Sequence, residues 1–598
     1  MAALSPAAAT AGGDAAMVNG PEGDVTDWPS IDWLEAEDEV RRLRQRIFTA
    51  SQAGDLKRVR NLQKLMLRSR SNTLLSVRRV AEVNAGRKTA GIDGKTALLE
   101  SQKAELADWV QQRSAWKPRA VKRVFIPKAN GKQRGLGIPV MRDRTLQALV
   151  LNALEPEWEA RFEPKSYGFR PGRGCHDAIA AIFITVKGKN PKRQWVLDAD
   201  LAAAFDRLSH DHLLESLGTF PARDLIRQWL TAGVVETGRF TPTGEGTPQG
   251  GVISPCLMNV ALHGMEEAAG VRYRLTGTKA GELAQGSPAL IRYADDLVVL
   301  CRSADEARQV KERLADWLTP RGLAFNEDKT RIAHLNEGHD FLGFNVRRYN
   351  SKLLIKPSKD AMRRIRARLS AEVLALRGSN AAAVIAKLNP IIRGWAAYYR
   401  GAVSSKAFDS LDNHVWKLVY KWAKFTHPTK PKGWVTARYF GPFNTSRQNR
   451  WVFGDRETGA YLTKFAWTKI VRHELVIKGA SVDDPALTEY WAKRRRRRKP
   501  PLSQFGLHLL QAQHGRCPLC EGLLLHADQE PQSPSEWEQW LRATRTAVRK
   551  NAVIADPGGG SDDHVDLRLI HVHCHRWRNA NRSSGTASLP AREAFGPA

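Results

Sequence analysis

The chain has 598 residues and a formal net charge of +31, because 93 Lys and Arg outnumber 62 Asp and Glu. A single hydrophobic core stops growing near ~250–300 residues, so a chain of this length is expected to form several domains. A positive excess of this size repels itself in the folded state, and its usual reason is a polyanionic partner such as a nucleic acid. The 6 cysteines are too few for a disulfide scaffold. No apolar run approaches the ~20 residues of a membrane span.

Composition and periodicity divide the chain into regions. Apolar residues recur at three-to-four spacing among arginines in two parts of the chain, which predicts helices there. Between these parts short strands alternate with helices, and a late Lys/Arg run that ends in two prolines indicates a linker. The division is a disordered tail (1–25), a helical extension (26–110), a mixed strand and helix region (111–355), a second helical region (356–430), a Trp-rich region with the basic linker (431–500) and a small C-terminal unit (501–598).

Three aspartates stand at the ends of apolar, strand-forming segments. Residues 291–300 are expected to form two strands whose turn carries Asp295 and Asp296, and an earlier apolar strand ends at Asp200. Buried carboxylates need partners, and hard divalent cations are such partners. A pair of cations can clamp an in-line displacement at phosphorus, one ion activating a 3′-hydroxyl and the other neutralising pyrophosphate. The pattern therefore predicts a two-Mg²⁺ site, which only tertiary folding could assemble.

Further motifs, in their order along the chain, resemble those of group II intron-encoded proteins. These proteins join a reverse transcriptase and maturase to an appended HNH-type endonuclease domain. The similarity runs from about Trp28 to Asn579, and the motifs that carry it lie at residues 89–94, 126–139, 166–176, 246–255, 293–296, 326–330 and 340–344. The resemblance implies a multidomain α+β right-hand polymerase. It would comprise a helical N-terminal extension, fingers and palm (111–355), a helical thumb with the maturase segment (356–430), a DNA-binding region (431–500) and a small zinc-bearing ββα domain.

The same resemblance implies residues that handle the incoming nucleotide. Lys128 and Arg134 on a fingers hairpin, together with Lys329, would contact the triphosphate. Phe205 matches the bulky residue that blocks a ribose 2′-hydroxyl, and Gln249 lies in the motif that lines the nucleotide pocket. The alternatives left open are that the cations are ordinary solvated charges and that Phe205 belongs to the core.

A second set of residues is expected to bind RNA. Arg173 lies in the motif that tracks template and primer, and the maturase-like segment contributes Arg393, Trp395, Tyr398 and Tyr399. Aromatic rings interleaved with arginine suit stacking on unpaired bases and gripping phosphates. An aromatic core stripe on a helix remains the alternative.

The C-terminal unit carries two short pairs of metal-binding residues. Cys517 and Cys520 form one pair and His571 and Cys574 the other, which predicts a structural Zn²⁺ site. His575 remains in the family's nuclease metal position. The adjacent histidines expected there are replaced by Asn551 and Ala552 if the alignment has not slipped, so we expect a DNA-binding remnant with little or no cutting activity.

The resemblance implies an RNA-directed DNA polymerase that binds its intron RNA, assists splicing and copies that RNA into target DNA. Its substrates would be deoxynucleoside triphosphates, and its place the cytoplasm of a bacterium, at the nucleoid and without a membrane partner. Whether it forms a homodimer is left open. One alternative is an RNA-binding maturase with an inactive polymerase, against which the intact Tyr-Ala-Asp-Asp at 293–296 speaks. The other is a retron-type or diversity-generating reverse transcriptase, which would lack the maturase-like segment and the C-terminal unit.

Overall fold

The structure is a computed structural model. It describes residues 26–112, 116–127, 133–278, 280–497, 509, 513, 517–518 and 531–541. Lys128, Cys520, His571, Cys574 and His575 lie outside the described residues, as do residues 1–25. None of the described helices is long and apolar enough to cross a membrane.

The N-terminal part is helical and packs around one long buried helix. Its elements are η1 (Trp28–Ser30), α1 (Trp33–Gln52), α2 (Leu56–Arg68), α3 (Arg70–Arg78), η2 (Arg79–Val83), η3 (Ala85–Lys88) and α4 (Glu100–Gln111). Asp55 and Ser69 cap α2 and α3, because their side chains accept the free backbone N–H of Arg58 and Asn72. The first three α-helices pack on α5 (Met141–Glu159), whose residues are mostly buried.

A four-stranded sheet, called here the outer sheet, adjoins these helices. Its order is β2 (Gln133–Ile138), β1 (Val121–Pro127), β4 (Val234–Glu236) and β5 (Arg239–Thr241). β1 and β2 pair antiparallel, so the 126–139 motif lies in a hairpin, as the resemblance implied.

The acid-bearing strands form a second four-stranded sheet, called here the central sheet. Its order is β6 (Ala289–Tyr293), β7 (Asp296–Cys301), β3 (Trp195–Asp200) and β8 (Arg331–His334), and all its pairings are antiparallel. β6 and β7 form the hairpin expected at residues 291–300. Alternate residues of these strands join two different cores, which explains why the strands are apolar on both faces.

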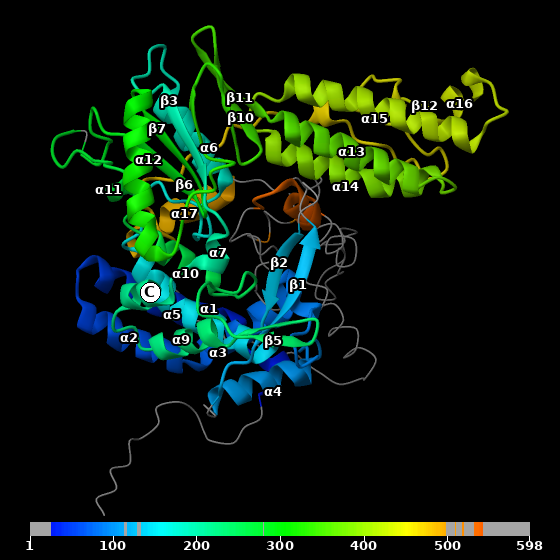
Figure 1. Ribbon diagram of the computed structural model, residues 1–598. Helices are drawn as coiled ribbons and strands as arrows, with labels where there is room; N and C mark the ends of the chain where they lie inside the picture. The colour runs from blue at the N-terminus through cyan, green and yellow to red at the C-terminus, as the bar shows by residue number, and fades with distance from the viewer. Residues whose placement is uncertain are drawn as a thin grey trace, which may run out of the picture.

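Helices cover both faces of the central sheet (Figure 1). On one face, α6 (Cys175–Val186) shares a core with the later part of the chain. On the other, α12 (Ala304–Leu318) shares a core with the N-terminal helices. The remaining elements of this region are α7 (Ala204–Arg207), α8 (His210–Leu217), α9 (Arg223–Thr231), α10 (Ser254–Ala261), α11 (Met265–Ala268) and η4 (Thr319–Arg321).

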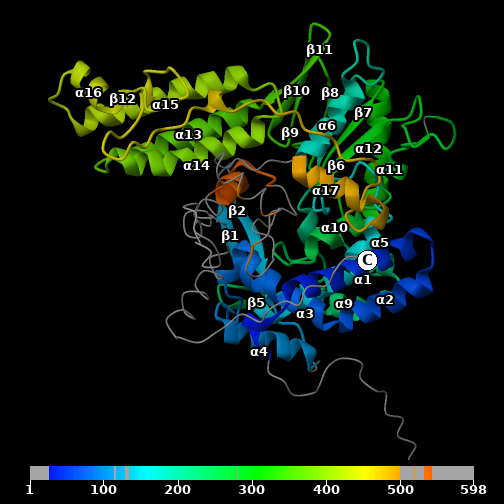
Figure 2. The same cartoon turned by 180° about the vertical axis from the view of Figure 1, so that it is seen from behind.

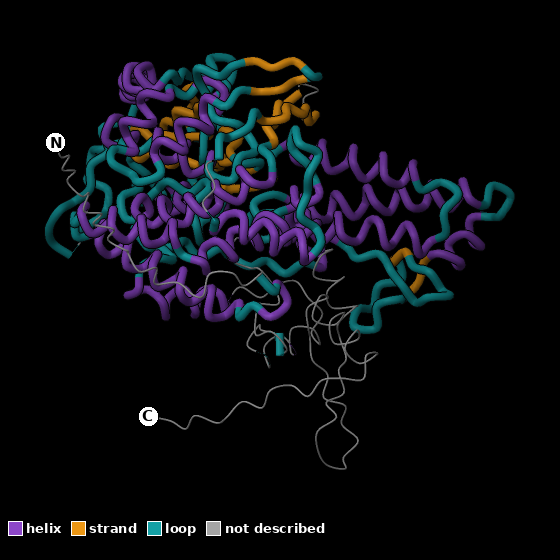
Figure 3. The backbone as a smooth tube through the Cα atoms, turned by 90° about the horizontal axis from the view of Figure 1, so that it is seen from below, coloured by secondary structure: helices purple, strands orange, loops and turns teal. Residues whose placement is uncertain are grey.

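Three long helices form an arm that projects from the sheets, as Figures 1 and 2 show from opposite sides. These helices, called here the three-helix arm, are α13 (Lys359–Ala375), α14 (Ala381–Tyr399) and α15 (Ser405–Thr426), and they run side by side in the view from below (Figure 3). A small sheet of β9 (His339–Phe341), β10 (Phe344–Tyr349) and β11 (Lys352–Pro357) leads into the arm. Ser358 and Asn380 cap α13 and α14.

The chain after the arm adds short elements and returns to the central region. They are α16 (Lys432–Tyr439), β12 (Phe440–Gly441), β13 (Val452–Phe453), η5 (Phe465–Trp467), η6 (Pro485–Leu487) and α17 (Thr488–Arg497). His473 and Arg494 both bond to Asp177 of α6, at 2.8 and 3.1 Å. The described part of the chain is therefore a mixed helix and sheet structure with several packed regions, which confirms the α+β multidomain expectation.

Candidate active site

The register of the central sheet brings the three aspartates together. Asp200, the last residue of β3, lies directly opposite Asp296, the first residue of β7. Asp296 also pairs with Tyr293 across a two-residue turn of Ala294 and Asp295. Ala294 has φ +58°, the left-handed conformation that so tight a turn requires. Residues far apart in the sequence thus meet at one end of the sheet.

Burial and mutual repulsion make this acid group electrostatically unusual. Burial, the charge of Asp295 and the charge and hydrogen bond of Asp200 raise the pKa of Asp296 to about 8. Burial also raises the pKa of Asp295, whereas the positive charges of Arg134 and Lys329 oppose that rise. The Lys329 ammonium forms an ion pair with Asp200. The three carboxylates of the site therefore outnumber the two nearby cations, Arg134 and Lys329.

This donor set suits hard cations. Its ligand atoms are carboxylate oxygens, which Mg²⁺ prefers, and added positive charge would relieve the repulsion between the buried acids. In the part of the chain that the structure describes, no group of three His, Cys, Asp or Glu side chains is placed so that it could hold a metal ion. Asp200 faces Lys329 instead. The residues fit divalent cations by charge and chemistry, and the carboxylates would have to turn toward a bound ion.

Two neighbouring aspartates have other partners. Asp198 lies on the same strand as Asp200 and forms an ion pair with Arg331, with Oδ2 3.3 Å from Nε. Asp206 is exposed and lies 3.4 Å from Arg123. Both positions agree with structural or solvent-facing roles.

A neighbouring loop holds the backbone of the turn that carries Asp295 and Asp296, called here the acid turn. Tyr167 N–H donates to Arg292 O at 2.9 Å, and Arg292 N–H donates to Lys165 O at 3.1 Å. Gly168 follows at the closest approach, where an added Cβ would lie 2.2 Å from the backbone N of Ala294. Only glycine leaves room for this contact.

A buried arginine, Arg292, supports the same turn with hydrogen bonds, an arrangement called here the brace. Arg292 Nη1 donates to Asn259 Oδ1 at 2.9 Å and to Ala294 O at 3.3 Å. Asn259 in turn donates to Gly168 O at 2.9 Å, so one side chain links the turn to the loop. Burial alone would raise the pKa of Glu163, but its hydrogen bond with His263 and the charge of Arg292 lower that pKa to about 2. Its carboxylate lies 3.9 Å from Arg292 Nη2.

The bonds of Arg292 were not predicted from the sequence. The signal available for them was a charged residue, Arg292, inside the apolar run 289–300. A buried charge needs a partner, so this position had to be paired in the fold. The partners Asn259 and Glu163 come from distant segments and carry no local pattern.

The residues expected around the nucleotide occupy different settings. Arg134 stands exposed on β2 opposite Ile126, and Lys329 stands at Asp200. Phe205 is buried, and its ring meets that of Phe169 edge-on at 6.2 Å.

The backbone of the 246–255 segment holds its neighbours in place. Gln249 O accepts the N–H of Gly137 at 2.9 Å, which ties this segment to β2. Thr247 N–H donates to Phe205 O at 2.6 Å, which ties the segment to α7 as well.

The expected RNA-binding side chains are largely interior, which corrects the sequence interpretation. Trp395, Tyr398 and Tyr399 are buried in one aromatic cluster with Phe344, so no base can stack on them in this fold. The core alternative holds because these rings lie in the core that α14 shares with β10, α13 and α15.

The two arginines of that set are also engaged within the protein. Arg173 is buried and donates to Pro164 O and Ala480 O at 2.9 and 3.0 Å. Arg393 donates to Thr463 Oγ1 at 2.9 Å. Both arginines therefore hold parts of the fold together, and Arg173, which is buried, is not exposed to a phosphate in this structure.

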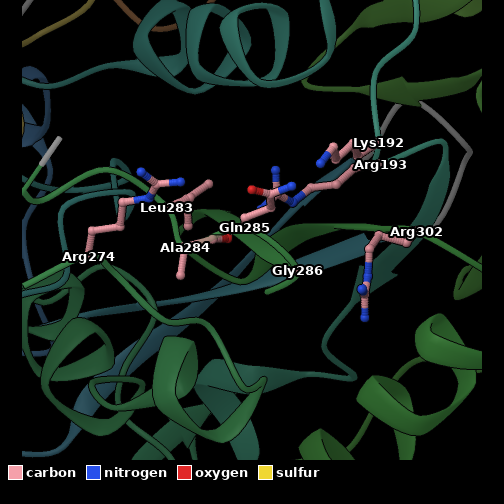
Figure 4. A pocket seen from close by; sticks show the side chains of 8 residues that line it. All are labelled: Lys192, Arg193, Arg274, Leu283, Ala284, Gln285, Gly286 and Arg302. Atoms are coloured by element: carbon pink, nitrogen blue, oxygen red, sulfur yellow. Dashed lines mark hydrogen bonds between the residues drawn. The ribbon is translucent and has the colours of Figure 1, made fainter.

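An exposed basic hollow lies at the opposite end of the central sheet from the acid turn. It is lined by Lys192, Arg193, Arg274, Leu283, Ala284, Gln285, Gly286 and Arg302 (Figure 4). Arg193 is fixed there by its bonds to Ser287 O and Ala284 O. Four cations around one hollow suit a phosphate backbone.

Comparisons with known proteins agree with this geometry. Residues 126–346 match the family model described as reverse transcriptase (RNA-dependent DNA polymerase), which places the fold and the acid turn in that class of enzyme. Residues 28–110 match the N-terminal domain of reverse transcriptase, and residues 362–440 match the group II intron maturase-specific domain. Protein YkfC of Escherichia coli is 32% identical over 343 residues, which are 52% of this chain and 90% of YkfC. The chain belongs to the group II intron reverse transcriptase and maturase family.

Two further matches are less similar to this chain in sequence. Group II intron-encoded protein LtrA of Lactococcus lactis is 28% identical over 321 residues, which are 44% of this chain and 53% of LtrA. Apo telomerase from Candida tropicalis shares 14% identity at a TM-score of 0.33, covering 53% of this chain and 58% of that chain. The chain thus spans about half the length of these relatives. Its reverse transcriptase domain is that of an RNA-directed DNA polymerase, with divalent metal dependence, and its maturase domain is that of a splicing and mobility factor.

Proposed function

We propose that this chain extends a DNA primer on an RNA template by two-metal nucleotidyl transfer, with Mg²⁺ held by Asp200, Asp295 and Asp296. The observation that carries the proposal is the strand register that sets Asp200 opposite Asp296. In this scheme the central sheet is the palm, the outer sheet belongs to the fingers and the three-helix arm is the thumb.

The metals and the side chains have separate tasks. Bound Mg²⁺ would supply Lewis acidity at the primer 3′-hydroxyl and at the leaving pyrophosphate. Lys329 and Arg134 would contact the triphosphate, where positive charge stabilises a departing anion. Phe205 would lie under the sugar and exclude a 2′-hydroxyl, while Gln249 keeps its segment against β2. Lys128 would join these cations at the triphosphate.

The test is primer extension by the full chain on poly(A) with oligo(dT) and Mg²⁺. The double variant Asp295→Asn/Asp296→Asn should lose about 10³-fold or more in rate, since several kcal/mol of transition-state stabilisation depend on the cations. Asp206→Asn is the matched control, because that carboxylate is nearby, exposed and outside the acid group. If the double variant extends primers as fast as this control, the three-aspartate site is not catalytic.

The RNA-binding role rests on charge and on the maturase domain. We assign intron RNA contact to the exposed cations of the basic hollow rather than to the buried residues of α14. The intron RNA, the target DNA and deoxynucleoside triphosphates are the proposed partners, in the bacterial cytoplasm at the nucleoid. In a splicing assay with the flanking intron RNA, the Asp295→Asn/Asp296→Asn protein should still promote splicing. Equal loss of splicing and extension would refute this separation of roles.

The zinc proposal concerns the C-terminal unit alone. Cys517, Cys520, His571 and Cys574 would hold one structural Zn²⁺, as two short ligand pairs commonly do. Metal analysis of the purified chain should find zinc, and a Cys520→Ser/Cys574→Ser variant should lose it. An unchanged zinc content in that variant would exclude this ligand set.

A further inference from the structure

A short C-terminal segment, residues 531–541, lies inside the polymerase region. It sits between the tips of β1 and β2 and the helices α13 and α14, and the two opposite views agree on this position (Figures 1 and 2). Its last residues are helical. This position is notable because a template–primer duplex must also pass between the acid turn and the thumb.

One end of the segment touches the acid turn. The Cys175 backbone N–H donates to Gln532 Oε1 at 2.6 Å, and the Tyr293 hydroxyl donates to the same oxygen at 3.4 Å. Tyr293 is the β6 residue paired with Asp296. Gln532 therefore contacts the residue that is paired with Asp296, one of the proposed metal-binding carboxylates.

The other end lies flat against the three-helix arm. An added Cβ at Gly394 of α14 would come within 2.8 Å of Glu538 N and 2.9 Å of Pro534 O, so the two backbones are in close contact. Trp537 is buried in the core that includes α14, and its ring packs edge-on against Trp540. The segment is therefore packed into the arm.

Charge complementarity fixes the docked position. Glu538 is only 5% exposed, and its Oε2 lies 2.6 Å from Arg368 Nη2 of α13. A buried carboxylate is costly without a partner, so this pair is specific to the docked state. Residues 531–541 carry two glutamates and no Lys or Arg, in a chain whose net charge is +31. An acid seated on a thumb arginine presents the charge that a phosphate would present there.

The segment lies where a bound duplex would have to lie. A primer whose 3′-hydroxyl reaches the three aspartates must place its first base pairs beside Tyr293. The Gln532 side chain already occupies that place, within hydrogen-bond distance of the Tyr293 hydroxyl.

We propose that the surface formed by Cys175, Tyr293, Arg368 and Gly394 has two mutually exclusive occupants. Residues 531–541 fill it in the protein free of nucleic acid, and the RNA–DNA duplex displaces them when it enters. The segment thus competes with the substrate and limits engagement of weakly bound duplexes. This inference rests on the proposed polymerase function, because it identifies the same cleft as the duplex path.

The test compares full-length variants that change the charge by the same amount. Glu538→Ala removes the buried acid, whereas Gln539→Lys changes an exposed neighbour in the segment and serves as the control. Affinity for a fluorescent poly(A)/oligo(dT) duplex is measured by anisotropy, and primer extension is measured at limiting and at saturating duplex.

Glu538→Ala should tighten the apparent Kd about 5-fold or more, because a larger fraction of the protein has an open cleft. Its extension rate should rise at limiting duplex and stay unchanged at saturation, while Gln539→Lys should change affinity far less. Gln532→Ala should act in the same direction, which guards against a local folding defect in the first variant. Unchanged or weaker duplex binding in both variants would overturn the proposal. Duplex binding without nucleotide addition in every form, wild type included, would instead refute the polymerase function and leave the competition measurable.

Discussion

Replacing Arg292 with methionine should loosen the acid turn without touching a carboxylate. The substitution keeps an apolar stem of similar length and removes the guanidinium that bonds Asn259 and the carbonyl of Ala294. Each buried acceptor left without its donor costs about 1–3 kcal/mol, so two of them give roughly 2–6 kcal/mol. Glu163 would also lose a cation 3.9 Å away. We expect a loss of about 4 kcal/mol in the free energy of unfolding.

The catalytic effect should be larger than a change in substrate binding explains. A shift of about 1 Å in the turn can cost about 10²-fold in rate, because the reacting groups lose their alignment. The expected signature is a lower kcat with little change in KM for the nucleotide, and Arg292→Lys should recover only part of it, since an ammonium lacks the guanidinium fork.

Urea unfolding and steady-state primer extension measure the two effects. The control is Arg308→Met on α12, an exposed arginine whose loss should change stability by no more than about 0.5 kcal/mol. If Arg292→Met unfolds at the urea concentration of the control and keeps a wild-type kcat, the brace does not position the turn.

Three further predictions test other parts of the structure. Gly168→Ala should reduce primer extension about 10²-fold, because its Cβ would collide with the turn backbone, whereas Gly188→Ala, with open space around it, should have wild-type activity. Burial would raise the pKa of Asp177, but its hydrogen bond to His473 and the nearby positive charges lower that pKa to about 2. Asp177 should therefore contribute stability that is present above its unfolded pKa near 3.8 and is lost as pH falls toward 2. Thermal unfolding across that range should show a loss of about 2 kcal/mol in the wild type that is absent in Asp177→Asn, and parallel curves would contradict the assignment. Lys192→Ala/Arg274→Ala should lower the slope of log affinity against log salt for intron RNA by about 0.7–0.9 for each phosphate that is no longer neutralised. Primer extension on poly(A) should stay unchanged. An unchanged slope would exclude the basic hollow as an RNA-binding surface.

The acids of the site were predictable from the sequence, but the residues that hold them in place were not. The β6–β7 hairpin and the strand ending at Asp200 were predictable, because apolar strand-forming residues that stop at acids leave few other arrangements. Gly168 and Asn259 were not, since their roles depend on contacts between distant segments. No local pattern distinguishes a glycine that flanks the acid turn from one in an ordinary loop.

The aromatic stripe of α14 shows the opposite limit. Trp395, Tyr398 and Tyr399 have the spacing of a helix face, and that spacing suits a base-stacking surface and a core equally well. Tertiary packing decides between them, because β10 supplies Phe344 to the same cluster. The docking of residues 531–541 was likewise not predictable, since no pattern in that short acidic segment indicates Arg368 as its partner.

Binding of Mn²⁺, measured by its EPR signal in place of Mg²⁺, tests the central claim most directly. With a chain-terminated primer, its RNA template and the next nucleotide present, the wild type should bind a pair of ions, and Asp200→Asn and Asp296→Asn should each lose ion binding together with primer extension. A variant that lacks either carboxylate yet binds the same number of ions as the wild type would contradict the account.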